Sequence, residues 1–303
     1  MIERIAAFAT AGAMMIAAAV LASPAAAQDV AEIIEPSSRW NLNVGDSSCR
    51  AGRIFGEGSN RHVLIMDRLG PGDYFNLVVA GPAVERLKLN AGSNGLAFGF
   101  GPDEAMQERS LFLSTFPEFG AALTGTVAFA DLSDDAAGET DKDNAIGYRV
   151  SAEREKAIQW LDVRTKKSPG FRLETGSMGN IMAAMRQCTR DLMEQWGIDV
   201  ERHESMIRTP KPLNDASDWV SEKDYTSAMI RRGDQGVVRF RLSIDAEGSP
   251  TQCHVQGGTA PEALNDYACK LLLRRARFDP ALDKNGEPME SFYRASVRFL
   301  LPR

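Results

Sequence analysis

Two stretches near the C-terminus alternate between apolar and polar residues, and this pattern constrains the fold more than any other feature. The first is "GVVRFRLSID" (236–245) and the second is "FYRASVRFLL" (292–301). Their apolar members are Val238, Phe240, Leu242, Ile244, Tyr293, Ala295, Val297, Phe299 and Leu301. A period of two places all of these side chains on one face of a strand, so the pattern predicts two strands that each bury one face.

A second strand and a helix are expected between these two stretches. The turn "AEGSP" leads into "TQCHVQ" (251–256), and Thr259 to Glu262 reads as a capping box that opens a helix. An earlier helix is expected to begin at Ser221 and to end at Gly233. The apolar positions of the later helix are Leu264, Tyr267, Ala268, Leu271 and Leu272. The order α-β-β-α-β predicts a small antiparallel sheet with a helix across its apolar face.

The first 27 residues have the composition of a secretory signal peptide. A charged start leads into an Ala-rich apolar run, and Pro24 precedes the small residues Ala25 to Ala27. We therefore expect cleavage after Ala27, a mature chain in a bacterial periplasm, and no membrane span in that mature chain. A permanent membrane anchor is the alternative.

Residues 28–201 are expected to form a β-rich antiparallel domain with late helices. Short apolar runs from Arg39 to about Leu132 are separated by turn residues, as at Gly70 to Asp73, which favours an antiparallel sheet, a sandwich or a small barrel. The acidic stretch 131–144 is interpreted as a solvated loop. Helices are then expected after Ser151, over "AEREKAIQWLDV", and from Ser177 to Gly197.

The polar segment 202–218 is the predicted hinge between two domains. It contains Pro210 and Pro212 and has no periodic apolar pattern. The expected organisation is therefore a signal peptide (1–27), a β-rich domain (28–201), the hinge, and an α-β-β-α-β domain (219–303). The fold class is α+β.

The four cysteines, Cys49, Cys188, Cys253 and Cys269, are expected to form disulfides, because an even number in an exported chain favours pairing. Three pairings are possible on paper. Cys188 lies in the apolar stripe of its helix, so Cys49 on an early strand is its natural partner. Cys253 and Cys269 both face the interior of the C-terminal domain. Metal binding by Cys253, His254 and Cys269 is the alternative, although strand neighbours point to opposite faces.

The sequence gives no pattern typical of catalysis or of cofactor binding. The net charge of -6 provides no basic surface for nucleic acid. His62, His203 and His254 are the only histidines, and "HE" at 203–204 lacks the second histidine of a zinc-protease motif. We expect no catalytic residue, no metal and no cofactor. An envelope enzyme with its site in the β-rich domain is the competing class.

Residues 225–301 resemble the TonB C-terminal domain. The resemblance is carried by "GVVRFRLSIDAEGSP", by a second strand, by "ALNDYACKLLLRRARFDPALDKNGEP" and by the closing strand. It implies a non-enzymatic module that binds an extended segment of an envelope protein, such as a TonB-dependent outer-membrane transporter, by adding it to the sheet edge. Carried over by position, that edge is 291–300. Its outward-facing residues would be Phe292, Arg294, Ser296 and Arg298.

Three departures from the family pattern bear on energy transduction. The start of the chain looks cleavable, "TPKP" is the only trace of a Pro-rich spacer, and Tyr225 is followed by Thr226 where the family often has proline. We therefore expect a periplasmic binding protein. A membrane-anchored energy transducer for outer-membrane transport, with an uncleaved N-terminal helix, is the alternative. Arg294 and Arg298 also have a simpler interpretation, as charges that prevent unwanted sheet pairing.

Overall fold

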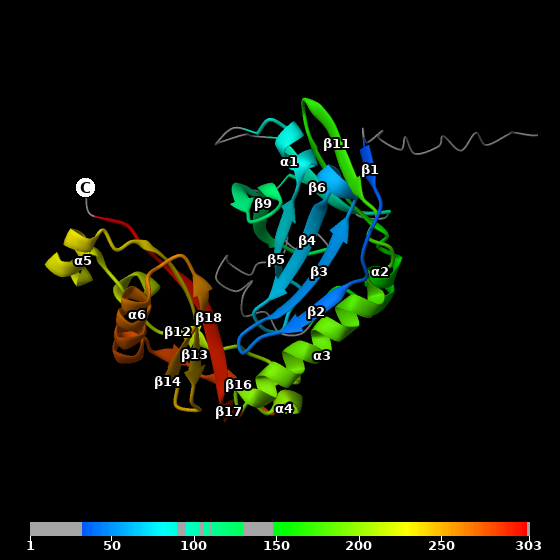
Figure 1. Ribbon diagram of the computed structural model, residues 1–303. Helices are drawn as coiled ribbons and strands as arrows, with labels where there is room; N and C mark the ends of the chain where they lie inside the picture. The colour runs from blue at the N-terminus through cyan, green and yellow to red at the C-terminus, as the bar shows by residue number, and fades with distance from the viewer. Residues whose placement is uncertain (1–31, 90–94, 103–105, 109–110, 130–147, 302–303) are drawn as a thin grey trace, which may run out of the picture.

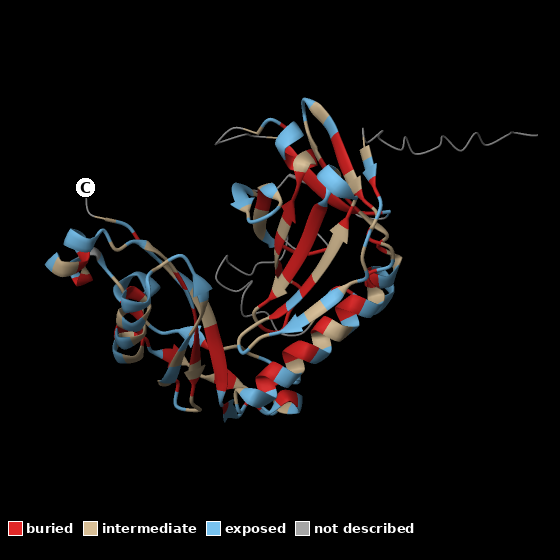
Figure 2. Cartoon of the chain, in the orientation of Figure 1, coloured by how far each residue is buried: buried red, intermediate tan, exposed pale blue. Residues whose placement is uncertain are grey.

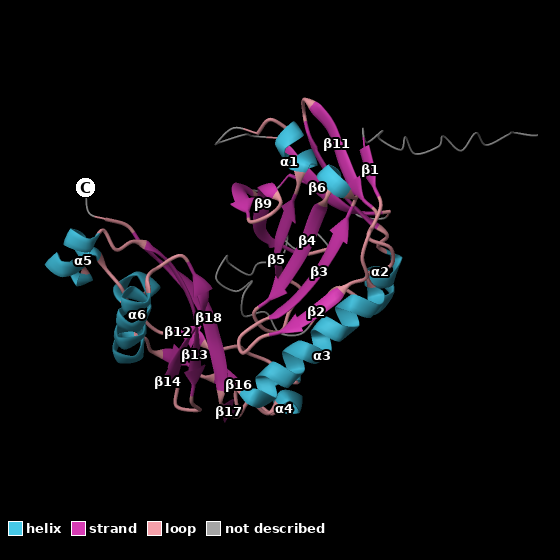
Figure 3. Ribbon diagram, viewed as in Figure 1, coloured by secondary structure: helices cyan, strands magenta, loops and turns pink. Residues whose placement is uncertain are grey.

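The computed structural model describes residues 32–89, 95–102, 106–108, 111–129 and 148–301. The predicted signal peptide and the acidic stretch 131–144 lie outside these residues. Helices and small, mostly antiparallel sheets together confirm the α+β class (Figures 1 and 3). Among the described residues, no helix combines the length and the apolar character needed to cross a membrane.

The N-terminal region contains two sheets. The six-stranded sheet is antiparallel, and its order is β2 (Asn41–Val44), β3 (Cys49–Phe55), β4 (His62–Arg68), β5 (Phe75–Ala80), β9 (Gly120–Val127) and β8 (Phe112–Phe116). The five-stranded sheet has the order β1 (Glu32–Ile34), β11 (Ser168–Leu173), β10 (Trp160–Thr165), β6 (Leu96–Gly101) and β7 (Gln107–Glu108). In this second sheet only β1 and β11 run parallel. The short helix α1 (Pro82–Arg86) follows β5.

One hydrophobic core fills the space between the two sheets. In β5, Phe75, Leu77 and Val79 are buried while Asn76 is only half-buried, as a strand with one face on a core requires. The Phe100 ring, from the other sheet, lies 4.8 Å from the Phe129 ring. The main helix of this region, α3 (Gly179–Gln195), places Ile181, Met182 and Met185 in the same core, and Figure 2 shows its buried stripe, which continues along the helix.

Two of the helix expectations are corrected by the structure. The helix after Ser151 is α2 (Ala152–Ala157), and it ends well before residue 163 because Leu161 and Val163 already alternate as the buried face of β10. Ser177 does not cap α3. Its hydroxyl donates to the Lys156 carbonyl at 2.8 Å, and Met178 occupies the cap position without a side-chain bond.

The C-terminal region contains the expected three-stranded sheet. Its order is β14 (Pro250–Gly258), β13 (Gly236–Ile244) and β18 (Ser291–Phe299), with all pairs antiparallel. Helix α6 (Glu262–Arg275) covers its apolar face. The order α-β-β-α-β is therefore present in the chain.

The helix starts in this region differ from the prediction. Thr259 is not a helix cap, because its hydroxyl accepts from the Val237 backbone N–H and α6 begins after Pro261. The single helix expected from Ser221 is divided into a 3-10 turn, η4 (Glu222–Asp224), and α5 (Ser227–Arg232), which Thr226 caps. Both polar side chains have other partners, since Thr259 accepts from Val237 and Ser221 donates its hydroxyl to the Asp224 Oδ2 at 3.1 Å.

The segment predicted as a hinge is attached along the C-terminal region rather than free. After α4 (Val200–Glu204), the strand β12 (Lys211–Pro212) pairs with β15 (Phe278–Asp279). A further 3-10 turn, η3 (Ala216–Asp218), leads to Trp219, which is 1% exposed in the core. Two short strands, β16 (Ala281–Leu282) and β17 (Pro288–Met289), form a hairpin before β18.

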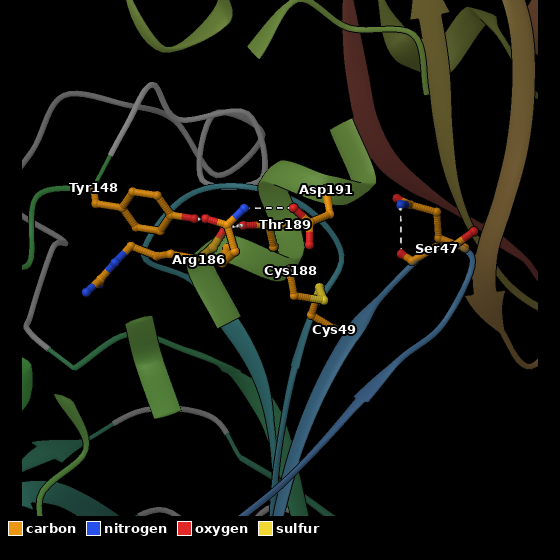
Figure 4. The surroundings of a disulfide bond; sticks show 9 residues. Ser47, Cys49, Tyr148, Arg186, Cys188, Thr189 and Asp191 are labelled. Carbon is orange, nitrogen blue, oxygen red and sulfur yellow. Dashed lines mark hydrogen bonds between the residues drawn. A yellow bond between two sulfur atoms is a disulfide. The ribbon is translucent and has the colours of Figure 1, made fainter. Parts of the chain in front are cut away.

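Two disulfides fasten helices to sheets. Cys49 in β3 is joined to Cys188 in α3, with 6.1 Å between the Cα atoms, and both residues are buried (Figure 4). Cys253 in β14 is joined to Cys269 in α6, with 5.5 Å between the Cα atoms. Because both C-terminal cysteines are in a disulfide, neither supplies the thiolate that the metal alternative requires.

Candidate partner-binding site

Strand β18 forms one edge of the three-stranded sheet. Within the described residues it pairs with β13 alone. An edge strand presents backbone N–H and C=O groups that no neighbouring strand satisfies, so it is a template for one more strand. This edge is where the resemblance placed the partner.

The first of the four predicted contact residues is not available to a partner. Phe292 is 4% exposed, since it packs against the N-terminal region. Its ring stacks on His203 at 5.0 Å and meets the edge of Trp196 at 5.6 Å. The period-two pattern identifies the face that Phe292 occupies but not what covers that face, so the expectation that Phe292 flanks a guest is corrected.

The other three residues differ in their access to solvent. Arg294 is half-buried, and its Nη2 donates to the Pro71 carbonyl at 3.2 Å. Its guanidinium also lies close to Gly70, where an added Cβ would stand 2.9 Å from Nη1. Ser296 and Arg298 are exposed, as is Leu300 just beyond the strand. The accessible part of the edge is therefore its C-terminal half.

The polar face of the same sheet is the surface that meets the N-terminal region. Arg241 is 3% exposed, and its guanidinium lies over the Trp196 ring at 4.0 Å. Burial and, second, the nearby charge of Arg294 lower the pKa of Arg241 to about 10. Gln256 extends the contact, since its Nε2 donates to the carbonyls of Ser47 and Leu69. Sequence analysis missed this interface, because Trp196 and Gln256 carry no motif.

A polar cleft of about 160 Å³ lies between the two regions beside β18. From the N-terminal region it is lined by Asp67, Leu69, Pro71, Tyr74, Phe75, Asn76 and Thr126. From the C-terminal sheet it is lined by Arg239, Phe240, Gln256, Arg294, Ala295 and Ser296. Two of the predicted residues, Arg294 and Ser296, thus face residues far away in sequence.

His203 at this interface gives a pH prediction. Burial and, second, the charge of Arg294 lower its pKa from 6.5 to about 4, so the folded chain holds a neutral imidazole. The unfolded chain binds the proton more readily, so stability is complete above about pH 6.5 and falls as the pH drops towards 4. The shift corresponds to about 3 kcal/mol. We expect His203→Phe, which keeps a ring against Phe292, to flatten this part of the stability profile measured by denaturant unfolding. If the parent and His203→Phe lost the same stability between pH 6.5 and pH 4, His203 would not be the group responsible for this loss.

Comparison with known proteins gives a family for the C-terminal region. Residues 221–301 match the family model described as the Gram-negative bacterial TonB protein C-terminal. The NMR solution structure of the Helicobacter pylori TonB C-terminal domain matches with 16% identity, over 35% of this chain and 87% of that one. Its TM-score is 0.22, so the superposition itself carries no argument. No curated protein matches the chain. Residues 221–301, which include all of β18, are therefore a TonB C-terminal domain.

Proposed function

We propose that this protein is a non-enzymatic binding protein that takes an extended segment of an envelope partner along the free edge of β18. The observation that carries the proposal is that, among the residues that the structure describes, β18 has a neighbouring strand on one side only, in a domain of the TonB C-terminal family. Backbone hydrogen bonds would supply affinity, and the side chains beside the edge would supply selectivity.

A TonB-dependent outer-membrane transporter is the partner we propose, and the periplasm is the compartment. The family description names Gram-negative bacteria, and the two disulfides are typical of an oxidising compartment. We also propose that 28–201 and 219–303 are separate domains. Their contact combines the polar face described above with a small apolar cluster around Phe292 that is separate from the main cores. Such a contact resembles a protein–protein interface rather than a continuous core.

The cover over Phe292 sets the direction from which a partner would approach. Ser296 and Arg298 are exposed while Phe292 is buried, so a guest strand would pair first beside 296–300. Pairing along the whole of β18 would bring the guest against the N-terminal region. The N-terminal region would therefore limit the length of guest that the edge accepts.

Site-specific photo-crosslinking in cells tests this proposal. We expect a photo-reactive residue at Arg298 on β18 to trap one envelope protein. The matched control is the same residue at Gln252, which is exposed on β14 at the opposite edge of the sheet. Equal trapping from both positions, or no trapping from Arg298, would count against strand addition at β18.

A further inference from the structure

The polar face of the C-terminal sheet has an unusual concentration of positive charge. The register places Arg241 directly opposite Arg294 and Arg239 opposite Ser296. Like charges opposite each other on neighbouring strands destabilise a sheet. The third strand brings Gln252, His254 and Gln256 to this face and no carboxylate. The arginines therefore cluster on this face, and none of the three strands places an acidic residue beside them.

The charge in the cleft is positive as well. Arg239 and Arg294 both line it, and Asp67 is the one carboxylate among the described residues of the lining. That carboxylate is already neutralised, since Arg50 donates to its two oxygens at 2.7 and 2.8 Å. Arg239 is exposed and, within the described part of the chain, has no ion-pair partner. Burial and, second, Arg241 lower the pKa of His254, in keeping with an excess of positive charge nearby.

The opposite wall of the cleft offers neutral donors. Thr126 donates its hydroxyl to the Asn76 Oδ1 at 3.0 Å, which leaves the amide nitrogen of Asn76 to donate to another group. Tyr74 also lines this wall. Guanidinium groups on one side and an amide on the other form a donor set that suits an anion with two oxygens.

We propose that this cleft is a binding site for a carboxylate group, held between Arg239 and Arg294 of the sheet and Asn76 of the N-terminal region. The site would thus be shared by both regions, and its occupation would favour the arrangement in which they are in contact. This gives the N-terminal region a role in ligand binding that strand addition alone does not. The inference does not depend on the proposed function, because the carboxylate can belong to a free acid or to a peptide.

Size and charge both favour a single carboxylate. The cleft volume of 160 Å³ is well below the roughly 300–1,000 Å³ of cofactor and drug-sized sites. It accommodates the end of an acidic side chain or a small organic acid. Arg50 neutralises Asp67, and Arg239, which has no ion-pair partner among the described residues, supplies one positive charge. One positive charge matches a carboxylate better than a doubly charged phosphate.

The test is an NMR titration of the full mature chain with acetate, at constant ionic strength maintained with chloride. We expect saturable shifts of the amides of 294–296 and of Asn76. Arg239→Gln should weaken acetate binding roughly tenfold, as loss of a charge-assisted hydrogen bond implies. Asn76→Ala should weaken it roughly threefold or more. The matched control is Arg274→Gln, which removes an exposed arginine from α6 on the other face of the sheet and should leave the affinity unchanged.

A second arm identifies the source of the carboxylate. The probes are an acetylated, amidated pentapeptide Thr-Val-Glu-Val-Thr and the same peptide with Gln in place of Glu. Tighter binding of the Glu peptide than of acetate, lost with Gln, would assign the site to a protein segment. Binding of acetate alone would assign it to a small acid. Amide shifts that rise linearly with acetate concentration, without saturation, would overturn the proposal. Equal effects of Arg239→Gln and Arg274→Gln on the acetate affinity would also overturn it, whether or not a partner binds at the β18 edge.

Discussion

Replacing Cys49 and Cys188 by alanine is expected to lower the free energy of unfolding by about 5 kcal/mol. The disulfide closes a loop with a sequence separation of 139, and the chain-entropy model assigns a larger stabilisation to a longer loop. Both cysteines are buried, at 0% and 3% exposure, and the bond fixes α3 to β3. Since α3 ends beside Trp196 and Phe292, its loosening should reach the interface between the two regions.

The matched control is the double replacement of Cys253 and Cys269. This disulfide closes a separation of 16, so the same model gives a loss of about 3 kcal/mol, confined to the C-terminal domain. Denaturant unfolding of both variants, compared with the oxidised parent, measures the two losses. We expect the larger loss of unfolding free energy for the Cys49 and Cys188 variant. A smaller loss for this variant than for the Cys253 and Cys269 variant would contradict the role of the first disulfide in fixing α3 to β3.

Phe292→Ala is expected to cost about 3–5 kcal/mol, the range for removing a buried aromatic side chain. The ring is 4% exposed and is held between Trp196 and His203, so alanine leaves a cavity at the contact between the regions. Phe292→Leu retains most of the apolar volume and should cost less than about 1.5 kcal/mol. Denaturant unfolding gives both values.

The same variant should also change access to β18. With the anchor removed, we expect faster hydrogen exchange at the amides of 291–295, while β14 is unaffected. A loss below about 1 kcal/mol for Phe292→Ala, together with unchanged exchange, would mean that the N-terminal region does not cover this half of the strand.

Much of the C-terminal domain could be predicted because its local patterns agree with its tertiary contacts. The alternation in 236–245 and 292–301 indicates both strands, and Gly233 ends α5 in the left-handed conformation at φ 72°. Two helix starts were predicted wrongly where a polar side chain has another partner. Ser177 donates to the Lys156 carbonyl and Thr259 accepts from Val237, so neither caps a helix.

The candidate site could be predicted only in part. The sequence indicates that Phe292, Arg294, Ser296 and Arg298 share a face. The surface that covers this face comes from residues far away in the sequence, such as His203 and, 223 positions before Arg294, Pro71. Pattern analysis of one strand contains no information about such a contact. The predicted hinge differs for the same reason, because β12 pairs with a strand that follows it by over sixty residues.

The most direct measurement of the central claim is the register of the contact at β18. Ser296, Arg298 and Leu300 would each be replaced by cysteine in turn. Each variant would be combined with single cysteines placed along the partner segment found by crosslinking, and the disulfides that form between the two proteins would be identified. A guest strand fixes one register, so each step of two residues along β18 should move the trapped partner residue by two. A partner residue that does not move with the step, or several partner residues trapped equally at each position, would contradict strand addition.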